Sequence, residues 1–258
     1  MQPPQNAYIH IPFCNSKCFY CAFVSTVNTK LELGYLIALL KEIDTNYQGN
    51  ALKTLYFGGG TPSIMPLEHV KKIFNKFYLE DNAEITFELN PENATLEYFK
   101  GLKGIGINRL SIGIQTFNNE ILKQIGRRHT SEQAKLAVNL AQKAEFDNIS
   151  LDFIYGLPNQ TLKDFEKDLE IAKTLNIQHI SLYGLKIEEN SVYGKKLPSN
   201  LPDDDLQADM YLKAIEVLND FNHYEISNFA KNGYDSKHNL NYWNNNQYYG
   251  FGCGAHGY

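Results

Sequence analysis

No apolar run in the sequence approaches the roughly 18 residues that a membrane span requires. The first residues, Met1, Gln2, Pro3 and Pro4, lack both the basic segment and the apolar segment of a secretory signal. We therefore expect a cytoplasmic protein with no membrane span. The chain also has few positive charges, with 24 Lys and Arg against 29 Asp and Glu, and the basic residues form no continuous stripe. This charge pattern argues against nucleic acid as a partner.

Cysteine is scarce as well, with four in a chain of 258 residues and no signal peptide. This indicates a reducing compartment, in which we do not expect disulfides to hold the fold. Three of the four, Cys14, Cys18 and Cys21, fall within eight residues. A structural zinc site would want four ligands in paired spacing, but Cys253 lies near the other end and His10 falls within a predicted strand. The crowding favours an iron-sulfur cluster, whose fourth iron would stay free for a substrate or cofactor. We interpret Cys253 as a small buried residue in a tight turn.

Hydrophobic residues make up 43% of the chain, enough to bury one large core, and their periodicity predicts strands that alternate with helices. The predicted strands span residues 7–13, 54–57, 84–89, 109–113, 148–154 and 179–183. The predicted helices span residues 31–47, 66–77, 96–102, 118–125, 131–144 and 162–175. This alternation indicates parallel βαβ units, which build either a doubly wound sheet or an incomplete barrel.

Residues that suit ligand binding lie at the carboxyl ends of the predicted strands. In both architectures, ligands bind at these strand ends. They are the glycines 58–60 after the second strand, Glu88 and Asn90 at the third, Gln115 after the fourth and Asp152 at the fifth. Consecutive glycines let a ligand approach bare backbone amides, although a glycine-rich turn after a strand is often only a turn. We expect one mouth to collect these residues.

Five motifs together resemble the radical S-adenosylmethionine superfamily, in its coproporphyrinogen-oxidase-like branch. They lie at residues 8–21, 58–63, 111–117, 126–129 and 152–158. The resemblance implies an α/β fold, a partial (β/α)6 barrel, followed by the start of a C-terminal α+β region. It also implies a 4Fe-4S cluster held by Cys14, Cys18 and Cys21, with the open iron chelated by S-adenosylmethionine.

Carried over by position, the resemblance assigns a set of residues to the S-adenosylmethionine pocket. They are Tyr8, Tyr20, Gly59, Gly60, Thr61, Glu88, Gln115, Arg127, Asp152 and Gly184. Carboxylates can accept hydrogen bonds from an amino group or ribose hydroxyls, and Arg127 can meet a carboxylate. The alternatives are solvated strand ends for Glu88 and Asp152 and a charge at a helix C-terminus for Arg127. No side chain is assigned a catalytic role.

Two families of this branch differ in one cysteine and one motif. The oxygen-independent coproporphyrinogen III oxidases carry a further cysteine two residues after the third, where this chain has Ala22 and Phe23. Residues 224–229 and 238–243 resemble the HemW-type haem chaperones, the second being their H-N-x-x-Y-W haem-binding motif. His238 would then ligate haem iron, with the Tyr and Trp of the motif against the porphyrin, unless the histidine is only a hydrogen-bonded residue at a core edge. His256 is an alternative second ligand, but because it follows a glycine-rich turn we interpret it, like His10 and His129, as structural.

The predicted organisation is a barrel over residues 1–196 and the beginning of a truncated C-terminal region over residues 197–258, where aspartates open a helix at 206–221. The implied function is binding haem as cargo and delivering it to acceptor proteins, such as respiratory-chain components, with an electron donor such as flavodoxin or ferredoxin. The alternative is the oxidase, which decarboxylates propionate side chains by radical chemistry. An electron-carrying iron-sulfur protein without S-adenosylmethionine would leave the strand-end motifs unexplained.

Overall fold

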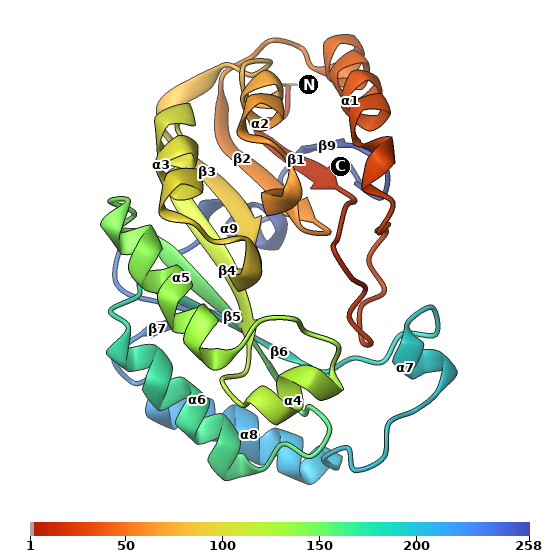
Figure 1. Ribbon diagram of the computed structural model, residues 1–258. Coiled ribbons are helices and arrows are strands. Elements are labelled where there is room, and N and C mark those ends of the chain that lie inside the picture. The colour runs from red at the N-terminus through yellow and green to blue at the C-terminus, as the bar shows by residue number, and fades with distance from the viewer. Residues whose placement is uncertain (1–2) are drawn as a thin grey trace.

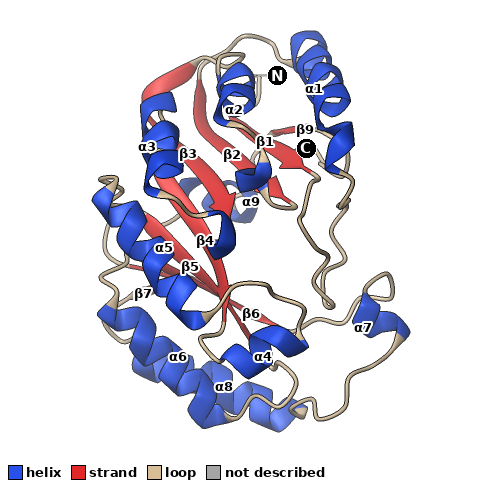
Figure 2. Cartoon of the chain, viewed as in Figure 1, coloured by secondary structure: helices blue, strands red, loops and turns tan. Residues whose placement is uncertain are grey.

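The computed structural model describes residues 3–258, in which one sheet of nine strands carries helices on its outer face (Figure 1 and Figure 2). Six parallel strands stand in chain order: β1 (Asn6–Ile11), β2 (Leu52–Gly59), β3 (Leu79–Leu89), β4 (Arg109–Gln115), β5 (Ile149–Tyr155) and β6 (His179–Gly184). The edge strands of the described part do not pair with each other, so the sheet is an open, incomplete barrel. The predicted α/β class and all six predicted strands are confirmed.

Helices connect successive strands, as right-handed parallel units require. They are α1 (Glu32–Asn46), α2 (Leu67–Phe74), α3 (Leu96–Ile105), α4 (Asn119–Gln124), α5 (Ser131–Lys143) and α6 (Leu162–Thr174). Single-turn 3-10 helices lie at Thr29–Leu31, Pro62–Ile64 and Pro91–Asn93. Within residues 3–258, no helix combines the length and the apolar character that crossing a membrane would take.

The two faces of the sheet differ because successive side chains of a strand point to opposite sides. On the outer face, Ile9, Phe57, Phe87 and Phe153 are fully buried against the helices and form the core. Parallel sheets are ordinarily apolar on both faces. Here the inner face carries polar and ionisable side chains instead, among them Tyr8, Tyr56, Glu88, Arg109, Ser111, His179 and Ser181. A polar inner face of this kind is suited to a ligand site.

Residues after 184 extend both edges of the same sheet. Helix α7 (Val192–Lys195) is followed by α8 (Asp204–Val217), which packs on α6, and the Asp203 carboxylate caps α8 by accepting the Leu206 N–H. The predicted helix is confirmed, although it starts two residues earlier than expected and ends at Val217, not at residue 221. The remaining elements are β7 (Asn222–Glu225), β8 (Asn228–Ala230) antiparallel to β6, α9 (Lys237–Trp243) and β9 (Tyr249–Phe251) parallel to β1. The assignment of residues 197–258 to the beginning of a C-terminal region stays a prediction.

Cys253 lies exposed in the turn after β9, and not buried as expected. The turn itself is confirmed, since Gly252 and Gly254 both adopt positive φ. The prediction of burial was wrong because it followed the average behaviour of cysteine, whereas the turn carries this side chain outward.

Candidate functional site

The three clustered cysteines lie on the loop that leaves β1. Its two ends are tied together, because the Cys14 N–H donates to the Thr26 carbonyl over 3.0 Å and the Thr26 N–H donates to the Pro12 carbonyl over 2.7 Å. Farther along, the Phe19 N–H donates to the carbonyl of Ile125 over 3.0 Å. All three thiols are free and partly accessible. The loop therefore presents three thiols from a braced backbone.

A hydrogen-bonded chain connects two of these cysteines across the strand ends. The Thr61 hydroxyl is 3.6 Å from Cys14 Sγ and accepts from Asn90 Nδ2 over 3.0 Å. Arg127 Nη2 donates to Asn90 Oδ1 over 2.8 Å, while its Nη1 is 3.6 Å from Cys18 Sγ. Donors aimed at cluster sulfurs tune the potential of iron-sulfur clusters. Thr61 and Arg127, both predicted site residues, thus meet the cysteine loop.

The donor set fits an iron-sulfur cluster. Burial raises the pKa of the Cys14 and Cys21 thiols, so it takes a bound cation to hold them as thiolates. Among the described residues, no three His, Cys, Asp or Glu side chains converge on a point where one metal ion could sit. Each thiolate of a four-iron cluster binds a different iron, so its ligands need not converge in that way.

Gly59 and Gly60 sit where a side chain would collide with the site. A Cβ on Gly60 would lie 2.7 Å from the carbonyl oxygen of Phe13 and 3.0 Å from Cys14 Sγ. A Cβ on Gly59, whose φ is 110°, would lie 2.6 Å from the ring of His10. These glycines let β2 approach the cysteine loop closely.

His10 fastens the same loop to β1. Its Nε2 donates to the carbonyl of Val24 over 2.7 Å, so the unprotonated Nδ1 accepts from the Tyr8 hydroxyl over 3.2 Å. Tyr8, a predicted pocket residue, therefore stands beside the loop on the inner face.

Glu88 and Asp152 are partly buried carboxylates on the inner face. Glu88 accepts from the Tyr56 hydroxyl over 2.7 Å and from the Gly59 N–H over 3.2 Å. Burial raises its pKa to about 7, and nearby Asp152 adds to the rise. Asp152 accepts from the Ser111 hydroxyl over 2.8 Å, and burial raises its pKa as well. Both carboxylates are hydrogen-bonded within the inner face, and their part in ligand binding stays a prediction.

The other predicted pocket residues lie at the same mouth or at its rim. Gln115 adopts a φ of 62° at a register shift of β4, and its Oε1 is buried with no hydrogen-bond partner. Tyr20 is partly buried beside Cys18 and Arg127. Gly184 ends β6 in an exposed position, where an added Cβ would meet the Tyr155 hydroxyl at 3.1 Å. Gln115 thus offers an unused acceptor, while Gly184 lies at the rim.

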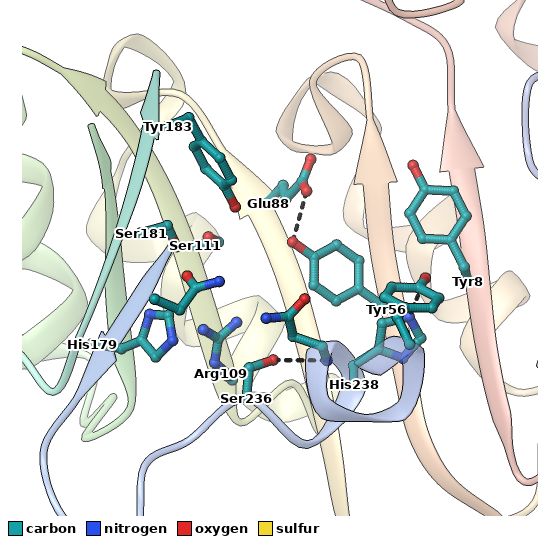
Figure 3. A pocket seen from close by; sticks show the side chains of 13 residues that line it. Tyr8, Tyr56, Glu88, Arg109, Ser111, His179, Ser181, Tyr183, Ser236 and His238 are labelled. Carbon is teal, nitrogen blue, oxygen red and sulfur yellow. Dashed lines mark hydrogen bonds between the residues drawn. The ribbon is translucent and has the colours of Figure 1, made fainter. Parts of the chain in front are cut away.

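His238 lies on α9, deep in the inner face and 2% exposed. Thr54 Oγ1 donates to Asn6 Oδ1 over 2.9 Å, so it accepts from His238 Nδ1 over 2.6 Å. The opposite nitrogen, Nε2, then accepts from the Tyr242 hydroxyl over 2.8 Å. Burial lowers the pKa of His238 to about 3, with Arg109 adding to the effect, so the ring is neutral. Tyr56 stacks on it at 5.0 Å and joins it to Glu88 (Figure 3).

Three residues that shape the site were not assigned to the S-adenosylmethionine pocket from the sequence. Asn90 was expected at the mouth, but not as the bridge between Thr61 and Arg127. Tyr56 and Arg109 went unnoticed on the inner face. The signal that could have found them is the alternation of Tyr56 with buried Phe57, and of Arg109 with buried Leu110, along their strands.

Comparisons with known proteins agree with the motifs. A profile of the Radical SAM superfamily matches residues 8–172. The chain is 40% identical to the heme chaperone HemW of Lactococcus lactis, covering 100% of this chain and 70% of the relative. It is 40% identical to HemW of Escherichia coli, covering 99% of this chain and 70% of the relative. The structure of the coproporphyrinogen III oxidase HemN of Escherichia coli superposes with a TM-score of 0.87 at 25% identity, covering 98% of this chain and 64% of that one.

Proposed function

Because the chain belongs to the Radical SAM superfamily, and within it to the family of the HemW heme chaperones, we propose that it binds haem and delivers it to acceptor proteins in the cytoplasm. The observation that carries the proposal is the similarity over the whole chain at about 40% identity. Acceptors would include respiratory-chain components, and an electron donor such as flavodoxin or ferredoxin would serve the cluster.

The superfamily implies a 4Fe-4S cluster and S-adenosylmethionine, and the residues present fit both. Cys14, Cys18 and Cys21 would hold the cluster, which supplies an electron and an open iron for the ligand. Gly60 lets the end of β2 lie close to the cysteine loop, and Arg127 donates a hydrogen bond to the sulfur of Cys18. Glu88, Asp152 and the unused Oε1 of Gln115 supply acceptors for the amino and hydroxyl groups of S-adenosylmethionine.

Haem ligation by His238 is the finer part of the proposal. The neutral ring presents the lone pair of Nε2, which is the form that binds metals. The Tyr242 hydroxyl occupies that nitrogen, so haem must displace it. Tyr242 and Trp243 are 38% and 54% exposed and offer flat surfaces for the porphyrin. On this proposal, the Tyr242 hydroxyl would compete with the haem iron for His238 Nε2.

A pair of variants tests this arrangement. His238→Ala should weaken haem binding and shift the Soret band, because the axial imidazole is lost. Tyr242→Phe should strengthen haem binding several-fold, because it keeps the ring but removes the hydroxyl bonded to Nε2. Haem titrations followed by absorption measure both, with the exposed His256→Ala as the matched control. A Soret band that is the same in all four proteins would rule out His238 as a ligand.

The oxidase is the second candidate function, favoured by the TM-score of 0.87 with the Escherichia coli enzyme. The chain has Phe23 where the oxidase pattern has its further cysteine. Phe23 is 68% exposed on the loop and offers no thiol at this position. On this basis we favour the chaperone.

A further inference from the structure

A cavity of about 210 Å³ lies between the inner face of the sheet and α9 (Figure 3). Its volume is below the 300 Å³ or so at which pockets for whole drug-sized molecules begin, so it suits one arm of a ligand. Its lining combines aromatic rings with polar groups, and Arg109, Ser111, His179, Ser181 and Ser236 are labelled around it. Such a lining can accept a charged or hydrogen-bonding group.

Arg109 is buried in this cavity and makes no direct ion pair. The residue is 3% exposed, and its Nε has no hydrogen-bond partner. Among the described residues, no carboxylate lies within ion-pair distance of its guanidinium. Glu88 and Asp152 attract it from farther away. A buried charge without a direct partner is costly, and a bound anion would give Arg109 the direct partner that the described residues do not supply.

The neighbouring ionisable groups are already engaged, Glu88 with the Tyr56 hydroxyl and Asp152 with the Ser111 hydroxyl. The Glu84 carboxylate accepts from the backbone N–H groups of Lys237 and His238, each over 3.0 Å, at the start of α9. His179 is bonded at both nitrogens, to Ser150 and Tyr224. Burial and Arg109 lower its pKa, so that it stays uncharged. Among the described residues that line the cavity, Arg109 is thus the permanent positive charge.

We propose that this cavity is a carboxylate subsite, in which Arg109 binds one propionate of a porphyrin. The proposal rests on the proposed function, since it names how the haem cargo is oriented. A propionate is a carboxylate on a short flexible chain, which matches a small polar cavity with an arginine in its wall. Tyr183 and Tyr242, 47% and 38% exposed, line the same cavity and offer flat surfaces to the macrocycle outside.

Metal-free protoporphyrin IX and its dimethyl ester separate propionate recognition from iron ligation. Titrated by fluorescence against the full chain, the acid should bind about tenfold to a hundredfold more tightly than the ester. Arg109→Gln should remove this preference while leaving ester binding unchanged. Arg109→Lys should restore part of it, because the charge returns without the two-pronged geometry. The exposed Arg128→Gln is the matched control and should behave as the unchanged protein.

The comparison of acid and ester in the unchanged protein needs no variant to fold. Equal affinities there would overturn the subsite and leave haem binding in place. Absence of both haem and porphyrin binding would overturn the subsite and the proposed function together. S-adenosylmethionine is the other source of a carboxylate. If Arg109→Gln weakened its binding and left the porphyrin preference intact, the subsite would belong to S-adenosylmethionine and the proposal would be wrong.

Discussion

Serine in place of Cys14, Cys18 or Cys21 is expected to reduce the iron content of the anaerobically reconstituted protein from about four per chain to none. A hydroxyl is a hard and weakly acidic ligand, whereas iron in such clusters is held by soft thiolates. The fourth cysteine, Cys253, is exposed in the turn after β9 and is not part of the cysteine loop. Iron analysis and the absorption of the brown protein measure the effect.

Cys253→Ser is the matched control and should keep the full iron content, because this exposed thiol lies outside the three-cysteine motif. Complete loss of iron in this variant, or stoichiometric zinc in the protein as purified, would contradict the cluster assignment.

Alanine at Glu88 or Asp152 is expected to weaken S-adenosylmethionine binding to the cluster-loaded protein by about tenfold to a hundredfold. Each change removes a hydrogen-bond acceptor from an enclosed site, at a cost of roughly 1.5 to 3 kcal/mol when the group is charged. Asp81→Ala, at an exposed position near the start of β3, is the control and should have no effect. The perturbation of the cluster's paramagnetic resonance spectrum by added ligand gives the affinity.

The same titration distinguishes a radical SAM protein from an electron carrier. A spectrum that does not change with saturating S-adenosylmethionine in the unchanged protein would favour the electron carrier. Normal binding by both alanine variants would instead remove Glu88 and Asp152 from the pocket while keeping the ligand.

The fold was predictable because each parallel strand leaves a local pattern. Runs such as residues 149–154 combine apolar and β-branched side chains between turn signals, and their alternation with helices fixes the parallel arrangement. The short strands β7, β8 and β9 carry no such pattern in three or four residues. They form because they pair with the edges of a sheet that exists already, which is tertiary information.

The site was predictable as a set of strand ends and not as a network. The cysteine spacing and the glycines 58–60 are local, so the sequence displays them. The bridge through Asn90 and the pairing of Arg127 with the cysteine loop join residues up to 109 positions apart. Neither segment alone carries a sequence pattern that predicts these contacts. For His238 the motif gave the residue but could not show that Tyr242, four positions on, occupies its nitrogen.

Haem binding set beside decarboxylation in one anaerobic preparation tests the proposed function most directly. The cluster-loaded protein receives S-adenosylmethionine, a reductant and coproporphyrinogen III while carbon dioxide is followed, and a parallel sample is titrated with haem. The chain spans about 70% of the length of its HemW relatives, so the Lactococcus lactis protein is run as the control. We expect a saturable Soret band and no carbon dioxide. Multiple turnovers of coproporphyrinogen III, with no haem bound by either protein, would contradict the chaperone and establish the oxidase.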